Sequence, residues 1–320
     1  MAYVAGDTIK ASEYNTFVAS SSDPFGYNHT AGTGSGALGM GQTELGQVTA
    51  DAGPVTAAQF NALLTGIDNI ANHTNVSVTA RTQVSAGDTI KIKSAVATDL
   101  AALATAVAAG STSATDGLTN NQLRQVTTGS AGWDSSATHE LSVTFANANN
   151  MRFYFNAGGK IRITTDVSGS VTGDKDTCFT DLGSGLGNLD IGSLATTRSG
   201  STETLTTNNL SRGYRDLTTS YQNIIKLTSD NSNYTDNTLE IQAKLNASPD
   251  SSTVITIKAI YTDGESDTTF TSGNTSSVPA DPNQAPQVRT TVTERHPNDS
   301  DGLGAAIQSS ANAEVSNSTS

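Results

Sequence analysis

The chain has 320 residues, of which 35% are hydrophobic, 5% aromatic and 15% charged, and its formal net charge is −13. This balance argues against a nucleic-acid binder, because binding phosphate requires clustered Lys and Arg, whereas the 17 basic residues here are scattered. The shortage of large apolar residues predicts small cores that oligomerisation stabilises. No run of apolar residues is long enough to predict a membrane span, and the single cysteine, Cys178, excludes a disulfide within the chain.

A short sequence motif recurs near the start of the chain. Ala-Gly-Asp-Thr-Ile-Lys stands at Ala5–Lys10 and again at Ala86–Lys91, and Ala52–Ala57 is a degenerate copy. The first and middle copies lead into Ala11–Val18 and Ala57–Leu64, which share the order small, small, Glu or Gln, aromatic, Asn, small, apolar, apolar. A duplication builds architecture, whereas catalysis generally needs one unique constellation of side chains. The pattern therefore favours a structural protein.

Apolar side chains recur at helical spacing within residues 1–80, which we predict to form a duplicated helical docking module. Thr56 and Gln59 have the spacing of a capping box, in which each side chain binds the backbone N–H of the other residue. The helix that follows carries one apolar stripe, and Ala11–Val18 carries a shorter one. We expect the two stripes to pack against each other and against a partner subunit. This expected assembly interface consists of Tyr14, Phe17, Val18, Phe60, Leu63, Leu64, Ile67 and Ile70.

The segment between the two stripes is dense in glycine, which predicts a loop. Its Gly34-x-Gly36-x-x-Gly39 matches the dinucleotide fingerprint letter by letter, but no apolar strand precedes it, so a loop is favoured over a nucleotide site. Residues 81–132 predict an Ala-rich helix followed by a connection. The apolar face of that helix consists of Val96, Leu100, Leu103 and Val107, with Asp99 expected on the opposite face.

From Trp133 onward the hydrophobic period changes to two, which is typical of strands. Thr238–Leu245 and Thr253–Tyr261 alternate apolar and polar residues, and turns rich in Gly, Asn, Asp and Ser separate such stretches. We predict an antiparallel β-sandwich of jelly-roll type over residues 133–278. Residues 279–320 are poor in apolar side chains and predict a polar extended C-terminal arm that orders only against a neighbour. The expected fold class is therefore α+β.

The ionisable residues do not combine into a recognisable reaction centre or metal site. The four histidines are far apart in the sequence and lack paired ligand spacing. Five acidic residues have the chemistry of glycosidic catalysis, but nothing in the sequence brings two of them into one cleft. The acidic turns at residues 263–267 and 299–302 lack the downstream Glu of a calcium loop. We expect no catalytic residue, no cofactor and no metal site among these candidates, which are His29, His73, His139, His296, Glu140, Asp166, Asp174, Asp176 and Asp181.

Six stretches together point to a known class of protein. They are Tyr14–Phe17, Gly39–Gln42, Phe60–His73, Met151–Ile163, Leu217–Gln222 and Leu239–Asn246, of which Met151–Ile163 is the most specific. They resemble a family of virion structural proteins of tailed phages that infect marine bacteria, especially cyanophages. Met40 departs from this family, in which we expect an aromatic residue at that position, and the resemblance does not include Ile90–Gly110.

The resemblance implies a tail or baseplate component without enzymatic activity. Its partners are then other virion structural proteins and further copies of itself as a homo-oligomer. The protein is expected in the virion, assembled in the host cytoplasm and released with the particle.

Three alternative functions fit the sequence less well. A tail fibre or spike module that binds a cell-surface glycan needs exposed aromatic side chains, for which Trp133, Tyr214 and Tyr234 are the candidates. A capsid decoration protein binds the head lattice instead of the tail. A tail-associated hydrolase is disfavoured, because carbohydrate-degrading sites stack sugars on aromatic rings and this chain has few.

Overall fold

The structure, a computed structural model, describes residues 10–19, 25–49, 54–88, 93–113, 118–128, 133–168, 173–232, 234–264, 286–297, 303 and 311–320. The chain forms two compact units, each made of several segments. A helical unit comprises Met1–Thr119, Asn147–Gly159 and His296–Gln308, and a sheet unit comprises Asn120–Ala146, Lys160–Arg295 and Ser309–Ser320. This division differs from the four consecutive segments expected from the sequence. The recurring motif lies largely outside the described residues, which include only Lys10 of the copy at Ala5–Lys10 and the first half of the copy at Ala86–Lys91.

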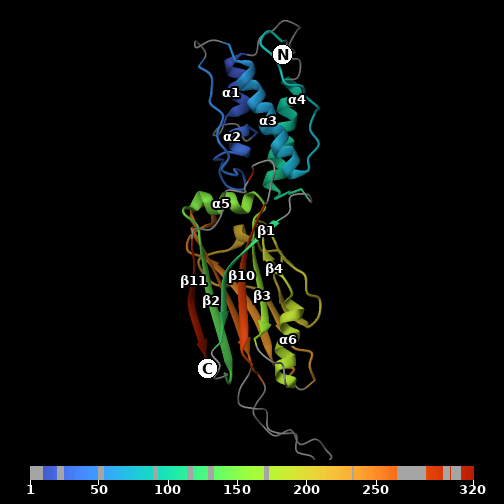
Figure 1. Cartoon of the computed structure of the whole chain (residues 1–320), viewed down its shortest axis with the longest axis vertical. Helices are drawn as coiled ribbons and strands as arrows, with labels where there is room; N and C mark the ends of the chain where they lie inside the picture. Colours follow the sequence, from blue (N-terminus) through green and yellow to red (C-terminus); the bar gives the residue numbers. More distant parts are fainter. Residues whose placement is uncertain are drawn as a thin grey trace, which may run out of the picture. The chain divides into compact units, whose positions relative to one another are not determined.

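The helical unit begins with four helices, which come before the first strand in the chain (Figure 1). They are α1 (Ala11–Val18), α2 (Tyr27–Thr30), α3 (Ala57–Thr74) and α4 (Lys93–Ala108). The capping box predicted at the start of α3 is confirmed, because the Gln59 N–H donates to Thr56 Oγ1 (3.3 Å) and the Thr56 N–H donates to Gln59 Oε1 (2.9 Å). The helix ends at Thr74 and is capped by Asn75, whose left-handed φ of 55° is one that asparagine tolerates better than most residues.

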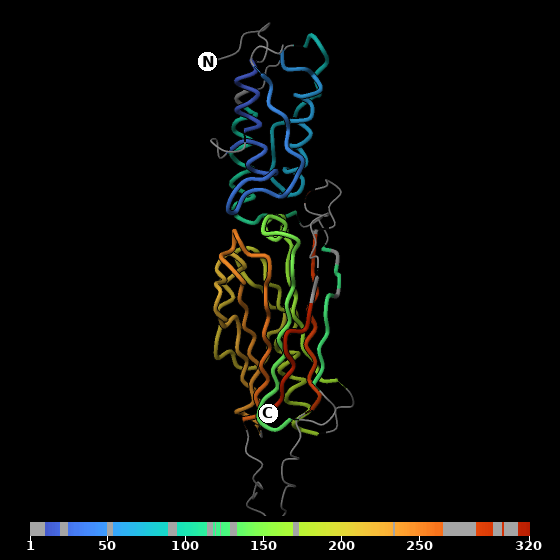
Figure 2. The backbone as a smooth tube through the Cα atoms, turned by 90° about the vertical axis from the view of Figure 1, so that its left-hand side faces the viewer, coloured from blue at the N-terminus to red at the C-terminus, as the bar shows by residue number. Residues whose placement is uncertain are grey.

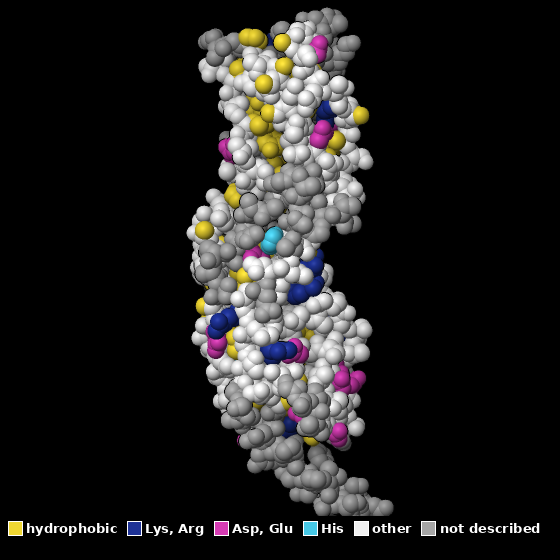
Figure 3. Space-filling view, in the orientation of Figure 1, with side chains coloured by type: hydrophobic (Ala, Val, Ile, Leu, Met, Phe, Trp, Pro, Cys, Tyr) yellow, Lys and Arg dark blue, Asp and Glu magenta, His cyan; other side chains and the backbone are white. Residues whose placement is uncertain are grey.

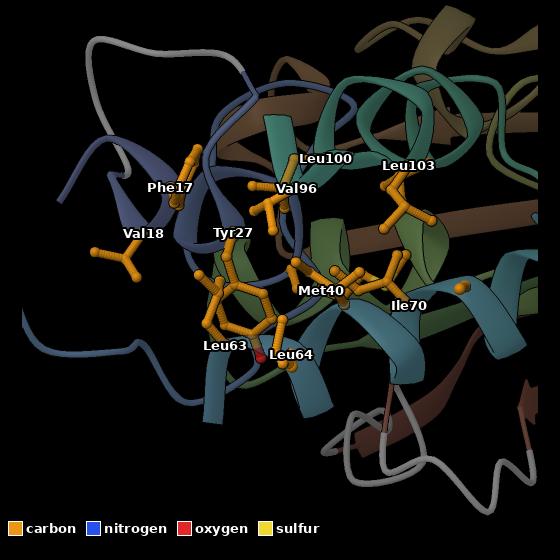
Figure 4. Packing of buried hydrophobic residues seen from close by; sticks show 14 of the residues in the cluster. Phe17, Val18, Tyr27, Met40, Leu63, Leu64, Ile70, Val96, Leu100 and Leu103 are labelled. Carbon is orange, nitrogen blue, oxygen red and sulfur yellow. The ribbon is translucent and has the colours of Figure 1, made fainter. Parts of the chain in front are cut away.

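The apolar stripes of these helices meet in one core. Figure 4 shows members of this buried cluster, among them Phe17 of α1, Leu63 and Ile70 of α3, and Leu100 of α4. The apolar face predicted for α4 is buried here, so α4 belongs to the same unit as α1 and α3. Asp99 of α4, which was expected on the face opposite the apolar one, is only 7% exposed and forms an ion pair with Arg81.

A short helix, α5 (Ala148–Asn156), also belongs to the helical unit, although the chain before and after it belongs to the sheet unit. The Asn147 side chain caps it by accepting the Asn150 N–H (2.9 Å). After α5 the chain turns through Gly158, whose φ of +91° is a left-handed conformation that glycine adopts at little cost.

The sheet unit contains two antiparallel sheets. The first has the order β1-β10-β3-β4-β5, and the second has the order β11-β2-β9-β8-β7-β6. The strands of the first sheet are β1 (Leu118–Thr127), β10 (Val288–Pro297), β3 (Lys160–Val167), β4 (Leu189–Ile191) and β5 (Thr196–Arg198). Those of the second are β11 (Ala311–Thr319), β2 (Ser136–Thr144), β9 (Val254–Thr262), β8 (Thr238–Leu245), β7 (Gln222–Thr228) and β6 (Thr204–Asn208). Two short 3₁₀ turns, Tyr214–Asp216 and Pro249–Ser251, lie between strands.

The two sheets face each other across a buried layer (Figure 2). Alternate residues of β2 are buried, as the period of two predicts. Thr290 of β10 joins the sheets, because its Oγ1 bonds to His139 Nδ1 of β2 (2.8 Å) and to the Tyr261 hydroxyl of β9 (2.8 Å). At one side the edge strands β1 and β11 are linked by an ion pair between Arg124 and Glu314 (3.1 Å).

The C-terminal region corrects the expectation of a polar arm at residues 279–320. Val288–Pro297 forms β10, which pairs with β3, and Ala311–Thr319 forms β11, which pairs with β2. Alternation explains β10, because Val288, Thr290 and Val292 are buried while the residues between them are not. A period of two can therefore build a strand even where apolar residues are few. The remaining residues of the expected arm lie outside the described residues, apart from Pro286, Gln287, Leu303 and Ser320.

Two further elements differ from expectation. The sequence predicted a connection at Leu118–Thr127, but this segment forms β1. It predicted part of the β-sandwich at Asp174–Leu186, but this segment forms the helix α6, which packs on β3. The apolar face of α6, with Phe179, Leu182 and Leu186, is buried. Among the described residues no helix is long and apolar enough to cross a membrane.

Candidate functional site

The residues predicted as an assembly interface form the interior of the helical unit. None of the eight side chains from Tyr14 to Ile70 is more than 5% exposed. The two stripes belong to one buried cluster, which also contains side chains of α2 and α4. Their predicted packing against a partner subunit is corrected, because α4 and the segment around Met40 already cover them. Apolar stripes mark burial, and only the tertiary structure decides whether the chain or a partner supplies the cover.

Asparagine side chains bind the backbone of distant segments in the same way at three places. Asn15 of α1 donates through Nδ2 to Val48 O (2.8 Å) and accepts the Val48 N–H (2.8 Å). Asn61 of α3 makes the same pair of bonds with Val84 (2.9 and 2.8 Å). A third asparagine, Asn28, binds Leu45 in this manner (2.9 and 2.8 Å). Asn15 and Asn61 occupy equivalent positions in the two sequence stretches that align, so the aligned asparagines have the same structural task.

The glycine-rich loop that precedes α3 is fixed by two side chains of α5. Arg152 donates through Nη1 to the carbonyl oxygens of Gly36 and Leu38. Asn156 donates through Nδ2 to the carbonyl oxygens of Gly36, Leu38 and Gly39 (3.0 to 3.1 Å). Both residues belong to Met151–Ile163, the stretch that carries the resemblance most specifically. Their polar groups therefore hold backbone in place.

This geometry also bears on the dinucleotide fingerprint in the same loop. A phosphate site needs backbone N–H groups that point at the ligand. Here carbonyl oxygens of the loop converge on Arg152 and Asn156, and no helix of the described residues begins at the loop's end. Gly34 serves close packing instead, because a Cβ there would stand 1.8 Å from the His29 carbonyl oxygen. The arrangement agrees with the interpretation as a loop.

None of the three aromatic residues expected at a glycan site is exposed. Trp133 is 4% exposed, Tyr214 0% and Tyr234 8%. The Trp133 ring packs edge-on against Phe179, with the ring centres 5.1 Å apart, and its Nε1 donates to Pro286 O (2.8 Å). These three side chains are buried. A glycan site at these positions would need exposed rings, so the structure does not favour one there.

Another tyrosine, which the sequence analysis did not single out, lies on the outer face of the second sheet. The half-buried Tyr221 precedes β7. The Nζ atoms of Lys244 and Lys258 lie 4.2 and 3.8 Å from its ring centre, and its hydroxyl donates to the Glu140 carboxylate. Ser316 of β11 donates to the same carboxylate (3.1 Å). Only the pairing of β2, β9 and β8 brings these residues together, which explains why no short motif revealed them.

Paired charges also cover the outer face of the first sheet. Asp190 of β4 accepts two bonds from Arg162 (2.7 and 2.8 Å) and one from Arg295 (2.9 Å). Burial raises the pKa of Asp190, but the bonds and charges of the two arginines outweigh burial and lower it overall. On the molecular face in Figure 3, basic side chains mostly stand beside acidic ones. The described residues on this face form no basic patch of the kind that binds nucleic acid.

The acidic candidates for glycosidic chemistry lie on three different elements. Glu140 lies on the outer face of the second sheet and Asp166 on the outer face of the first, so the two carboxylates point away from each other. Asp166 is held by Arg289 in a two-bond ion pair (2.7 and 2.6 Å). Asp174, Asp176 and Asp181 lie on α6. The carboxylates of Glu140 and Asp166 therefore both accept hydrogen bonds from other side chains of the protein.

The histidines are also far apart. The two with described hydrogen bonds, His73 and His139, bind other parts of the same unit. The buried His73 bonds through Nε2 to Ala157 O (3.0 Å) within the helical unit. Burial lowers the pKa of His139 to about 4, so its ring is neutral at ordinary pH. In the part of the chain that the structure describes, no three His, Cys, Asp or Glu side chains gather where they could hold a metal ion. The acidic turn at 299–302 and most of the turn at 263–267 lie outside that part.

Comparisons of the chain with protein-family models, with curated proteins and with solved structures gave no match.

Proposed function

We propose that this chain is a non-enzymatic structural protein of a tailed-phage virion, a component of the tail or baseplate. One observation supports the proposal most strongly. The stretch that carries the family resemblance most specifically, Met151–Ile163, contacts other segments of the same chain and stabilises the fold. Arg152 and Asn156 bind the glycine-rich loop, Ala157 O accepts a hydrogen bond from His73 Nε2, and Lys160–Ile163 begins β3. A stretch whose polar side chains hold other parts of the same chain suits a building block better than an enzyme.

Two finer features belong to this proposal. The helical unit arose by duplication, which the equivalent bonds of Asn15 with Val48 and of Asn61 with Val84 support. The facing sheets form a jelly-roll-like sandwich, which their antiparallel pairing supports. Both features are typical of proteins whose task is to present a rigid scaffold.

The test of the function is the location of the protein in particles. Peptides of the chain are expected in purified virions of the phage that encodes it, and antibody-labelled electron microscopy is expected to mark the tail or baseplate. Label on the head lattice instead identifies a capsid decoration protein. Absence of the chain from intact particles contradicts the proposal.

Assembly with other copies or with other virion proteins needs a surface that the chain itself leaves open. Leu205 is 41% exposed on β6, the edge strand of the second sheet, and most of that strand is exposed. An exposed edge strand pairs readily with another chain. We propose this edge as a subunit contact, in place of the buried stripes.

Replacing Leu205 with Asp tests this contact. We expect Leu205→Asp to shift recombinant oligomers toward monomers in sedimentation velocity, while Thr204→Asp, which adds the same charge on the same strand, shifts them less. A wild-type protein that sediments as a compact monomer at all concentrations contradicts self-assembly through this edge.

A second candidate function rests on Tyr221. Two lysine ammonium groups over a half-buried aromatic ring offer cations to an acidic sugar. A glycan array separates this receptor-binding function from a purely structural one. Binding that Tyr221→Ala abolishes supports the receptor-binding module, and an array without signal removes it.

A further inference from the structure

Lys175 and Asp263 form a fully enclosed ion pair in the sheet unit. Lys175 lies in the first turn of α6, and Asp263 directly follows β9, 88 residues later in the chain. Their side chains are only 5% and 1% exposed, and Lys175 Nζ donates to Asp263 Oδ2. None of the functions considered above uses either residue.

The surrounding backbone and side chains fix both partners. The Asp263 N–H donates to Ser135 O (3.0 Å), and the N–H of the next residue, Gly264, donates to Asn237 Oδ1 (2.8 Å). Lys175 shares a helical face with Cys178 and Phe179, which are both buried. Backbone hydrogen bonds therefore hold the segment of Asp263 in place, and the buried Lys175 side chain meets its carboxylate there.

The two residues that share the helical face of Lys175 have buried side chains. Phe179 packs edge-on against Trp133, and Cys178 Sγ donates to Ser229 Oγ (3.2 Å). Burial, the largest of several influences, raises the pKa of Cys178 to about 11, so this thiol stays protonated and does not compete as a nucleophile.

An ion pair in such surroundings bears a large desolvation cost, which transfer of one proton from the ammonium to the carboxylate relieves. The uncharged amine is a nucleophile, and the protonated carboxyl group can lose its hydroxyl as water. Holding two reacting groups in contact is equivalent to an effective concentration of about 10⁵–10⁸ M, which favours a condensation that free groups in water do not undergo.

We propose that Lys175 and Asp263 condense into an intramolecular amide crosslink. The Lys175 Nζ–Asp263 Cγ bond forms and one Cγ–Oδ bond breaks. The departing oxygen takes two of the three ammonium protons and leaves as water, so the reaction needs no oxidant, reductant or other reactant. The product closes a covalent loop that contains α6 and the strands from β4 to β9. Such a crosslink stabilises a protein chiefly by restricting its unfolded chain.

Mass spectrometry of the intact full chain under denaturing conditions tests the crosslink. We expect wild-type protein to weigh one water molecule less than its sequence requires, and proteolysis to yield a branched peptide that joins Lys175 to Asp263. Lys175→Met and Asp263→Ala are expected to restore the sequence mass. Lys226→Met removes another ion-paired lysine, 3.8 Å from Glu240 and more exposed, and is expected to keep the deficit.

Two results overturn the proposal. The first is a wild-type chain at its full sequence mass, a measurement that does not depend on whether any variant folds. The second is a water deficit that persists in Lys175→Met, since this identifies cyclisation of Asp263 onto the Gly264 nitrogen or another dehydration that needs no lysine.

Discussion

His139 is a neutral imidazole enclosed between the two sheets. Burial lowers its pKa from 6.5 to about 4, although the negative charge of Glu314 acts in the opposite direction. Between these two pH values the unfolded chain binds more protons than the folded chain, so the free energy of unfolding falls as the pH falls. The loss over the full window from about pH 6.5 to about pH 4 amounts to about 3 kcal/mol.

Urea unfolding of wild-type protein and of His139→Gln across this window checks the prediction. Carboxylates titrate in both proteins, so the difference in pH dependence isolates the imidazole. We expect the variant to lose less stability than wild type on acidification. Parallel stability curves for the two proteins contradict the role of His139.

Arg81 in the helical unit depends on Asp99 for charge compensation. The Arg81 side chain is 1% exposed and donates to the Asp99 carboxylate, which also accepts the Thr79 N–H (3.1 Å). Burial lowers the pKa of Arg81, and the nearby charge of Asp68 partly opposes this shift. Removal of one partner from a buried ion pair leaves the other charge uncompensated.

We therefore expect Asp99→Asn to lower the free energy of unfolding by about 3 kcal/mol, measured by urea denaturation. Asp68→Asn is the matched control, because Asp68 is 3.7 Å from the same arginine but its side chain is 53% exposed. Its effect is expected to stay below about 1 kcal/mol. Equal effects of the two substitutions would show that burial does not set the strength of the Arg81 contacts.

At the scale of elements, asparagines attach the segments between helices to the helices themselves. Asn61 on α3 satisfies both the N–H and the carbonyl of Val84, a residue without strand or helix partners of its own. Irregular backbone that packs against a core needs such partners, because an unpaired buried polar group is costly. The equivalent bonds at Asn15 and Val48 show the same solution at the other aligned site.

Asn61→Ala removes both bonds and is expected to cost about 1–3 kcal/mol of unfolding free energy. Hydrogen exchange at the Val84 amide is expected to accelerate more than exchange in the middle of α3. Asn72→Ala, at an exposed position of the same helix, serves as the control and is expected to change stability by less than about 0.5 kcal/mol. Unchanged exchange at Val84 in Asn61→Ala refutes the attachment.

At the scale of the whole molecule, each unit is built from segments far apart in the chain. The sheet unit takes its edge strand β11 from the C-terminus, and Ser320 O accepts the N–H groups of Ser135 (2.7 Å) and Ser136 (3.2 Å). Asn317 of β11 donates to Thr127 O of β1 (3.0 Å), which ties the last strand to the other sheet as well. The C-terminal residues are therefore part of the folded unit.

Truncation before Ala311 is expected to lower the midpoint of thermal unfolding and to promote association, because it uncovers the edge of β2. Circular dichroism and light scattering measure the two effects. A polar arm that orders only against a neighbour predicts neither change, so a truncated protein with the wild-type melting curve contradicts the strand assignment.

Much of the local structure could be predicted from the sequence. The capping box at Thr56, the apolar stripe of α3 and the alternation in β8 and β9 depend on residues within a few positions of one another. Such patterns reflect the helical and strand periods directly.

The candidate sites depended on longer distances, and the sequence predicted them less well. The predicted interface residues were correctly identified as apolar faces, but α4 and the Met40 segment cover them. Tyr221 and Glu140 are 81 residues apart, and Arg152 is 114 residues from Leu38. No short-range period relates such pairs.

The sequence by itself determined which apolar residues are buried along α1, α3 and α4 and along the regular strands β8 and β9, since that follows from the spacing of apolar side chains. Only the tertiary structure decided what covers the apolar stripes, that residues near the C-terminus complete both sheets, and that Lys175 meets Asp263. The physical reason is that strand pairing and helix packing join distant segments through backbone hydrogen bonds and shape, which leave little trace in the local sequence.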